Sequence, residues 1–130
     1  ANDTTAGEIT TALFNAGKSG VAVDFSRRGL KHLDLSELDF KGARLVRADV
    51  FGTDLSKANL ARTDLTGARL DRTVLTFANF KGANLEGATL APFGKTGFIE
   101  DLFRTELEGA QLNGANLGGS DLTYVSFRFA

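Results

Sequence analysis

Large apolar residues recur at every fifth position along most of this chain. From residue 25 to residue 90 the repeat occurs fourteen times without a miss, and it resumes at residue 102. These positions, termed centres here, are Phe25, Leu30, Leu35, Phe40, Leu45, Val50, Leu55, Leu60, Leu65, Leu70, Leu75, Phe80, Leu85, Leu90, Leu102, Leu107, Leu112, Leu117, Leu122 and Phe127. Steps of five advance about 140° around an α-helix, so the centres form no helical stripe.

Small residues stand two places before the centres in the regular part of the chain. At this spacing, the ten positions from 43 to 88 are all Ala or Thr. Residues two apart in a strand point to the same side. Each unit therefore reads as a three-residue strand followed by a two-residue corner, and the glycine common at the second corner position suits a turn with positive φ. The pattern predicts a chain that keeps turning the same way around an apolar axis.

The charges just before the centres indicate how many units complete one coil. Residues one coil apart stack at about 4.8 Å, where like charges are unfavourable. At separations of 15 or 25 residues, several pairs of aspartates would stack. At a separation of 20, opposite charges stack instead, in the pairs Asp24–Arg44, Arg44–Asp64, Asp49–Arg69 and Glu37–Lys57. Between residues 24 and 89, only Asp34 and Asp54 are alike at that separation, so the charges predict four sides per coil.

These features occur together in the stretches TDLSKANLARTDLTGARL and KGANLEGATL. Both stretches resemble the A(D/N)LXX pattern of the pentapeptide repeat family, and the resemblance covers roughly residues 23 to 127. It implies an all-β fold, a right-handed, four-sided parallel β-helix. Twenty centres at four per coil make about five coils. The resemblance supplies the handedness, whereas the charges already favour four sides.

The start of the chain predicts a short α-helix, over residues 5–17, that caps one end of the coil. Thr5 and Glu8 fit a capping box, the apolar residues at positions 9, 12, 13 and 16 share a helical face, and Gly17 can end the helix. A cap is needed because an open coil end exposes unpaired backbone. In the coil that follows, larger residues occupy the usually small places, namely Val23, Arg28, Leu33 and Leu38. Arg28 is expected to bend outward or to pair with a carboxylate.

The chain, residues 1–130, is expected to be one domain with regular coils over 23–90 and final coils over 102–127. Between these parts, an interrupting loop at 91–101 contains Pro92, the sole proline, and sets consecutive centres twelve residues apart. Proline cannot donate a ladder hydrogen bond, so either a loop leaves the coil here or one side bulges. Loops on rigid scaffolds often carry function. A functional loop and a tolerated insertion both remain open.

The C-terminal end lacks a helix pattern and is rich in aromatic residues. The candidates for an end cap or a dimer contact are Tyr124, Phe127 and Phe129. Either these side chains close the end of the coil, or a second copy covers it in a two-fold homodimer. Closure by the chain itself, and hence a monomer, is preferred because few residues would be exposed.

Five phenylalanines fall outside the core register and are candidates for a partner surface. They are Phe51 and Phe77 at corners, and Phe93, Phe98 and Phe103 in or beside the predicted loop. On a four-sided coil, Phe51 lies on the second side, which leads into the loop, and Phe77 leads off the third side. Exposed apolar patches mark partner surfaces. The alternative is packing under the loop, or self and crystal contacts.

The sequence offers no catalytic, cofactor or metal site. There is no cysteine and only one histidine, His32, at a corner position where a solvated side chain is expected. A zinc-type site from Cys and His is excluded by that count. The aspartates before the centres occupy the place that the repeat pattern reserves for Asp or Asn, and we expect them to bond to neighbouring backbone.

Composition limits the classes of partner. Fifteen Lys and Arg against sixteen Asp and Glu give a net charge of −1, which argues against nucleic acid. No apolar run approaches the roughly 18 residues of a membrane span, so membrane insertion is not expected. We therefore predict a non-catalytic scaffold that binds an unknown protein partner, and we expect no cofactor.

Other functions compete with this prediction. The resemblance includes quinolone-resistance proteins that bind topoisomerases as DNA mimics, but those are strongly acidic, unlike a chain of net charge −1. An enzyme is a further class, although nothing in the resemblance supplies a catalytic residue. The absence of Met indicates processing or a fragment, so the rod is alternatively a spacer in a larger protein. The start ANDTT fits a signal-peptidase site, which favours a periplasmic or lumenal location over a cytoplasmic one.

Overall fold

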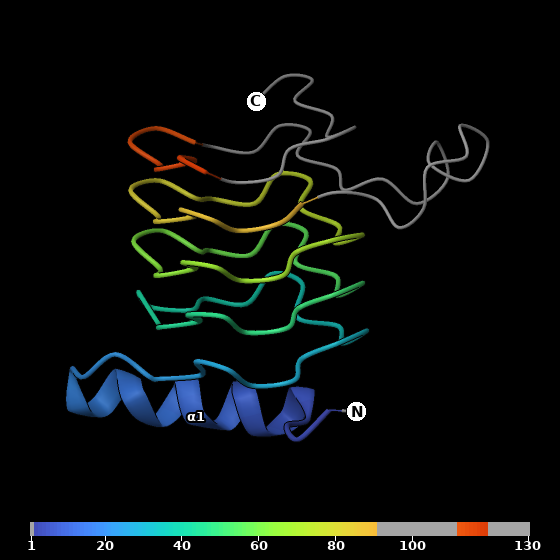
Figure 1. The fold of residues 1–130 in the computed structure, drawn as a ribbon. Helices are drawn as coiled ribbons and strands as arrows, with labels where there is room; N and C mark the ends of the chain where they lie inside the picture. The colour runs from blue at the N-terminus through green and yellow to red at the C-terminus, as the bar shows by residue number, and fades with distance from the viewer. Residues whose placement is uncertain (1, 91–111, 120–130) are drawn as a thin grey trace.

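A computed structural model of the protein describes residues 2–90 and 112–119. Within these residues the chain forms one helix, α1 (Ala6–Ser19), and then winds in stacked coils, as Figure 1 shows. α1 lies across one end of the stack, beside the first coil (Figure 1). The described coils contain no continuous strand, and parallel bridges between single residues join one coil to the next.

The bridges show how many residues make one coil. Between residues 24 and 89, every bridge joins residues that are twenty apart, as in Asp24 with Arg44 and Asp49 with Arg69. Twenty residues hold four five-residue units, so the four sides predicted from the charges are confirmed. The centres of the first side are Phe25, Leu45, Leu65 and Leu85, those of the second Leu30, Val50, Leu70 and Leu90, those of the third Leu35, Leu55 and Leu75, and those of the fourth Phe40, Leu60 and Phe80.

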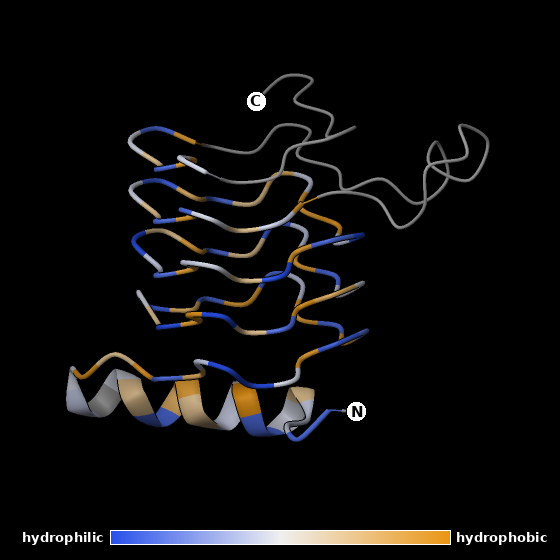
Figure 2. Cartoon of the chain, in the orientation of Figure 1, coloured by the Kyte–Doolittle hydropathy of each residue, from blue (hydrophilic) through white to orange (hydrophobic). Residues whose placement is uncertain are grey.

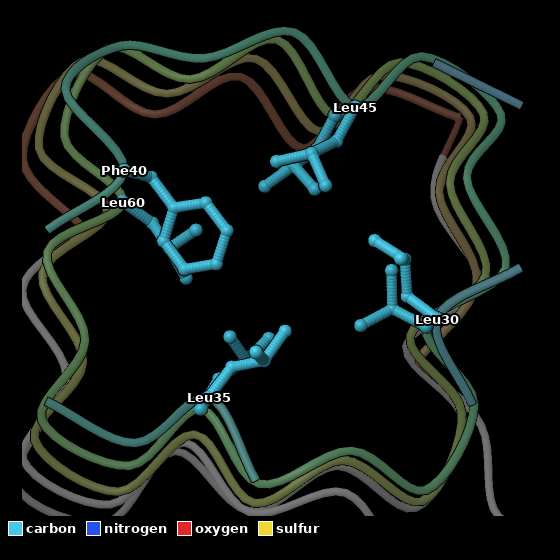
Figure 3. Close-up of a pocket in the computed structure, with 8 residues that line it drawn as sticks. Leu30, Leu35, Phe40, Leu45 and Leu60 are labelled. Atoms are coloured by element: carbon cyan, nitrogen blue, oxygen red, sulfur yellow. The ribbon is translucent and has the colours of Figure 1, made fainter. Parts of the chain in front are cut away.

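The centres point toward the axis of the coil and form the hydrophobic core. Figure 3 shows Leu30, Leu35, Phe40 and Leu45 pointing inward from the four sides. Every centre between residues 25 and 90 is at most 4% exposed, and the small residues two places before them are buried from position 43 on. The cavity left on the axis is about 10 Å³ and wholly apolar, so it has no room for a ligand. Figure 2 shows apolar residues alternating with polar ones along the described coils.

The corners turn through a hydrogen bond to the carbonyl of the preceding centre, as from Ala48 N–H to Leu45 O at 3.0 Å. The second corner residue has positive φ whether or not it is glycine, and the other residues there are Arg27, His32, Glu37, Arg47, Lys57, Arg62, Arg72 and Phe77. Positive φ alone therefore does not explain the glycines. Gly67 also leaves space for the Arg47 side chain of the preceding coil, because a Cβ at Gly67 would lie 3.2 Å from the Cγ of Arg47.

The residue before each centre points outward and, where it is Asp or Asn, binds the next corner. Its Oδ1 accepts the N–H two residues on at 2.9–3.2 Å in Asp24, Asp34, Asp39, Asp49, Asp54, Asn59, Asp64, Asn79, Asn84 and Asn116. The predicted bonding of these side chains to neighbouring backbone is confirmed. Hydrogen bonds from the hydroxyl and N–H of Ser36 lower the pKa of Asp34, and those from Ser26 lower the pKa of Asp24.

The start of α1 forms the predicted capping box. Glu8 N–H donates to Thr5 Oγ1 at 3.2 Å, and Thr5 N–H donates to Glu8 Oε1 at 3.2 Å. Ile9 and Leu13 are buried in the hydrophobic core, beside three partly buried residues of the first coil, Val23, Leu33 and Leu38. The larger residues of the first coil therefore pack against the hydrophobic core, to which α1 contributes Ile9 and Leu13.

The end of α1 differs from the prediction, which placed it at Gly17. The helix continues to Ser19 and ends in Gly20, which has a φ of 72°. Gly17 instead allows a close approach from the corner that ends the first coil. The Lys41 ammonium donates to the Leu13 carbonyl at 3.1 Å, and a Cβ at Gly17 would lie 2.6 Å from that ammonium nitrogen.

Residues before α1 cover the backbone edge of the first coil, which the sequence pattern does not indicate. The Asn2 side chain pairs with the backbone of Lys31 in both directions, donating to its carbonyl and accepting its N–H, both at 2.6 Å. Asp3 Oδ1 accepts the N–H of Gly29 at 3.1 Å. Gly29 stands where Asp or Asn elsewhere accepts the corner N–H. Asn2 therefore supplies the acceptor that the repeat lacks at this place.

The first side continues across the interruption in the repeat. Asn84 forms a bridge with Asn116, a separation of 32 residues, which is twelve more than one coil. Leu85 N–H donates to the Asn116 carbonyl at 2.8 Å. The predicted loop at 91–101 lies outside the described residues.

Candidate partner-binding surface

Two residues that stand out in the sequence, His32 and Arg28, lie at the surface. The His32 ring meets the Phe51 ring edge-on, with 5.4 Å between centroids. Arg28 points outward, as expected, and its Nη1 donates to Thr4 Oγ1 at 3.2 Å. Within residues 2–90 and 112–119, no group of three or more His, Asp and Glu residues is placed to hold a metal ion. In the same residues, no helix is both long and apolar enough to cross a membrane.

The corner after the second side holds Phe51, one of the aromatic residues predicted to form a partner surface. The guanidinium carbon of Arg69 lies 4.4 Å from the centre of the Phe51 ring, and that of Arg72 lies 5.4 Å from it. With His32 at its edge, the ring is half-buried. Cations over an aromatic face are attracted by its quadrupole. These contacts hold the Phe51 ring in place as part of the scaffold.

Acidic side chains balance the cations of this corner. Asp49 Oδ2 lies 3.4 Å from Lys31 Nζ and 3.7 Å from Arg69 Nη1. Asp71 Oδ2 lies 3.2 Å from Arg69 Nε and accepts a hydrogen bond from the Thr89 hydroxyl at 3.3 Å. These pairs link successive coils along the second side. The second side thus presents a network of paired charges.

The third side carries the most exposed apolar residues of the described coils. Phe77, at a second corner position with a φ of 57°, is 66% exposed, and Val74, just before a centre, is 38% exposed. Among the described coil residues, Val74 is the only large apolar residue before a centre, and Phe77 is the only one at a second corner position. Both belong to one five-residue unit. They place two apolar side chains in solvent on the same part of the third side.

Two stacked carboxylates lie on the third side below Val74. Asp34 forms a bridge with Asp54, which in turn forms a bridge with Val74, so the three residues stand in one column. The carboxylates accept the hydroxyls of Ser36 and Ser56 at 2.6 and 2.7 Å. Within the described residues, neither carboxylate forms an ion pair. Asp34 and Asp54 are the two aspartates that stand twenty residues apart in the sequence.

Only part of the predicted partner surface falls in the described residues. Phe51 and Phe77 are described, and they differ in exposure. The other predicted residues, Phe93, Phe98, Phe103, Tyr124, Phe127 and Phe129, lie outside the described part of the chain. Val74 was not among the residues predicted from the sequence. It can be recognised there as an apolar residue at a position that is polar or small in the other described units.

Comparison with a family model shows where the repeat is recognisable. The model described as pentapeptide repeats matches residues 53–90 and 101–130 in eight copies, which together make up more than half of the chain. No curated protein matches the chain.

Solved structures of similar proteins were also found. A pentapeptide repeat protein from the thylakoid lumen of Arabidopsis thaliana is 33% identical, with 82% of this chain and 66% of that chain covered and a TM-score of 0.42. The pentapeptide repeat protein Rfr23 from the cyanobacterium Cyanothece is 24% identical, with coverages of 80% and 63% and a TM-score of 0.42. QnrB1, a plasmid-mediated fluoroquinolone resistance protein, is 22% identical, with coverages of 82% and 65% and a TM-score of 0.23. The chain thus spans about two thirds of the length of these proteins.

Proposed function

The chain belongs to the pentapeptide repeat family, and we propose that it is a non-catalytic scaffold that binds a protein partner through its side faces or through residues 91–101. The observation that best supports this proposal is the third side, where Val74 and Phe77 expose apolar area on a regular surface. The repeat fold needs neither side chain at those positions. Exposed apolar area that the fold does not need is typical of a surface that a partner covers.

The proposed architecture of the whole chain follows the family. It is a right-handed coil of about five turns with α1 as the end cap, regular coils over 23–90 and final coils over 102–127. The four-sided register of the described coils supports it, and the handedness is taken from the family. A monomer is favoured over a homodimer through the C-terminal end. Sedimentation velocity across a range of protein concentrations distinguishes the two.

The proposal that the chain is not an enzyme rests on its chemistry. The sequence has no cysteine and one histidine, and that histidine packs against a phenylalanine ring. The aspartates before the centres accept corner N–H groups, which occupies one carboxylate oxygen of each. The axial cavity of about 10 Å³ admits no substrate.

A topoisomerase-binding DNA mimic is the alternative function within the family. This function is suggested by QnrB1, a fluoroquinolone resistance protein to which the chain is similar. A DNA mimic presents a strong negative field, whereas this chain has a net charge of −1 and mixed charges on its second side. Inhibition of DNA gyrase supercoiling at micromolar protein would support the alternative. The absence of any effect with excess protein would dismiss it.

The compartment and the wider context of the chain are also proposals. One similar structure is that of a protein from the thylakoid lumen. A periplasmic or lumenal location is therefore proposed over a cytoplasmic one. A role as a spacer within a longer protein remains the second alternative. Cell fractionation, together with the sequence of the complete gene, tests both points.

Affinity capture with the full chain tests the proposed function. Three baits are compared: the wild-type chain, a variant lacking residues 91–99, and the double variant Val74→Asn with Phe77→Gly. We expect the wild type to retain a partner that one of the two variants loses. Equal capture by all three baits, or capture of no partner by the wild type, would contradict a role for these surfaces.

A further inference from the structure

One unit of the third side, residues 73–77, departs from the features that stabilise most other units. Val74 replaces the Asp or Asn whose Oδ1 accepts the corner N–H, as Asp64 does for Thr66 at 3.1 Å. Phe77 places a bulky side chain at a φ of 57°, a conformation that such residues rarely adopt. It also leaves two thirds of that residue in water. Neither residue improves the fold, so stability does not account for them.

Within the described coils, the same side carries the only like-charged stack among the residues before the centres. Asp54 lies directly over Asp34, and stacked like charges destabilise a sheet. On the second side, by contrast, Asp49 is paired with Lys31 and Arg69. The third side therefore combines unpaired negative charge with exposed apolar area in one column. Such a combination fits a partner that brings both positive charge and an apolar side chain.

We propose that this third-side patch, defined as Asp34, Asp54, Val74 and Phe77, binds a short protein segment in which an apolar side chain lies near Lys or Arg. The inference deepens the proposed function and rests on it. The apolar side chain packs against Val74 and Phe77, and the basic side chains meet the two carboxylates. Coils are about 4.8 Å apart, so Asp34 and Val74 lie about 10 Å apart along the rod. An extended segment covers that distance in about three residues.

The size and charge of the patch decide between kinds of partner. A stable interface buries about 800 Å² on each side, far more than two side chains supply, which favours a short segment over a folded domain. A second copy joined by a two-fold axis would set the same carboxylates against each other. Nucleic acid and anionic lipid are repelled by the same carboxylates. A basic and apolar peptide segment is therefore the partner that fits.

Fluorescence anisotropy with a labelled synthetic peptide that repeats Lys-Lys-Leu-Leu tests the proposal on the full chain, because each face of this peptide in extended form carries both residue types. We expect saturable binding that weakens by about tenfold or more in the double variant Val74→Asn, Phe77→Gly. Asn restores the acceptor for the corner N–H, as Asn59 provides elsewhere, and Gly accepts the positive φ without strain. The variant is thus expected to fold at least as stably as the wild type, which a urea titration checks.

Matched controls separate this patch from general attraction. Arg62→Gly makes the same kind of corner change on the fourth side and should bind the peptide as the wild type does. Asp34→Asn with Asp54→Asn keeps the corner acceptors but removes both charges, so binding should weaken and lose most of its salt dependence. Peptides that repeat Glu-Glu-Leu-Leu or Lys-Lys-Ser-Ser should bind at least about tenfold more weakly.

Several results would overturn the inference. They are no binding of the Lys–Leu peptide by the wild type, equal binding by the Val74 and Phe77 double variant, or tighter binding of duplex DNA or phosphatidylserine vesicles than of the peptide. If the peptide fails but affinity capture still finds a partner that requires residues 91–99, the inference is wrong and the proposed function stands. If the wild type captures no partner at all, the proposed function itself is wrong.

Discussion

Two phenylalanines at corners of neighbouring sides have opposite surroundings. Phe51, after the second side, is half-buried, with the guanidinium groups of Arg69 and Arg72 over its ring and a histidine ring meeting it edge-on. Phe77, after the third side, is 66% exposed. Both lie at corners of the five-residue repeat, Phe51 at the first corner position and Phe77 at the second. Their surroundings also differ, because a histidine and two arginines from neighbouring coils contact the Phe51 ring.

In a regular scaffold, side chains from neighbouring coils decide whether a corner residue is structural or available to a partner. Around Phe51 these side chains are His32, Arg69 and Arg72. Two carboxylates form ion pairs with Arg69 and hold it in place. The third side leaves an aromatic and a valine in solvent above two carboxylates. We infer that the second side stabilises the rod and that the third side is available to a partner.

The largest effect is expected from a substitution at a centre, because the centres form the buried core. Leu65 is fully buried on the axis. Leu65→Asp places an unpaired charge there and should destabilise the fold by more than about 4 kcal/mol, enough to unfold most of the rod. Circular dichroism with thermal melting measures this. Arg62→Asp, at the exposed corner just before this unit, is the control and should change the melting temperature little. If both variants melted like the wild type, the inward assignment would be wrong.

The next effect concerns the cation that holds Phe51. Arg69→Ala removes the contact with the ring and two ion pairs of a half-buried side chain, so the free energy of unfolding should fall by about 1–2 kcal/mol. Urea unfolding monitored by circular dichroism measures the change. Arg44→Ala is the matched control, since Arg44 also precedes a centre but is exposed and forms no ion pair within the described residues. A loss in the control as large as in Arg69→Ala would contradict the role of the second-side network.

A gain of stability is expected on the third side. Val74→Asn supplies the Oδ1 acceptor that the corner N–H finds in most other units, which is worth about 0.5–1 kcal/mol. The same urea experiment should show a higher midpoint for this variant. Val74→Ala removes the apolar side chain without adding an acceptor and should show no such gain. A midpoint for Val74→Asn below that of the wild type would mean that the valine stabilises the fold.

The smallest effect is the pH dependence of Asp34. The hydroxyl and N–H of Ser36 lower the pKa of Asp34 in the folded state. Because this pKa lies below the unfolded value of about 3.9, the stabilisation is complete above that value and is lost as the pH falls through the folded pKa. Asp34→Asn should therefore flatten the fall in urea midpoint below about pH 4. Asp24→Asn should act in the same direction, since Ser26 lowers the pKa of Asp24. An unchanged slope in both variants would show that these bonds contribute nothing.

Much of the coil could be predicted from the sequence because each rule recurs many times. The centres, the small residues beside them and the side-chain bonds before them follow from a period of five, and charge stacking gave the number of sides. The end of α1 could not be predicted, because Gly17 leaves space for the Lys41 side chain of the first coil. The pairing of Asn2 with Lys31 likewise joins residues that no repeat relates.

The candidate surface was only partly predictable, for a related reason. Sequence alone identifies Phe51 and Phe77 as aromatic residues outside the core register, but it does not tell them apart. Their difference depends on side chains such as Arg72 reaching across a corner from the next coil. Val74 could have been identified from its position in the repeat, because the other described units have a polar or small residue at that position.

Urea unfolding of Phe51→Ala and Phe77→Ala under identical conditions tests most directly whether the second side stabilises the rod while the third side is available. Phe51→Ala is expected to lower the free energy of unfolding by about 1–2 kcal/mol, because a half-buried ring and its two cations lose contact. For Phe77→Ala we expect a change within about 0.5 kcal/mol, as for other exposed surface positions. Equal losses in the two variants, or a larger loss for Phe77→Ala, would contradict the distinction between a stabilising second side and an available third side.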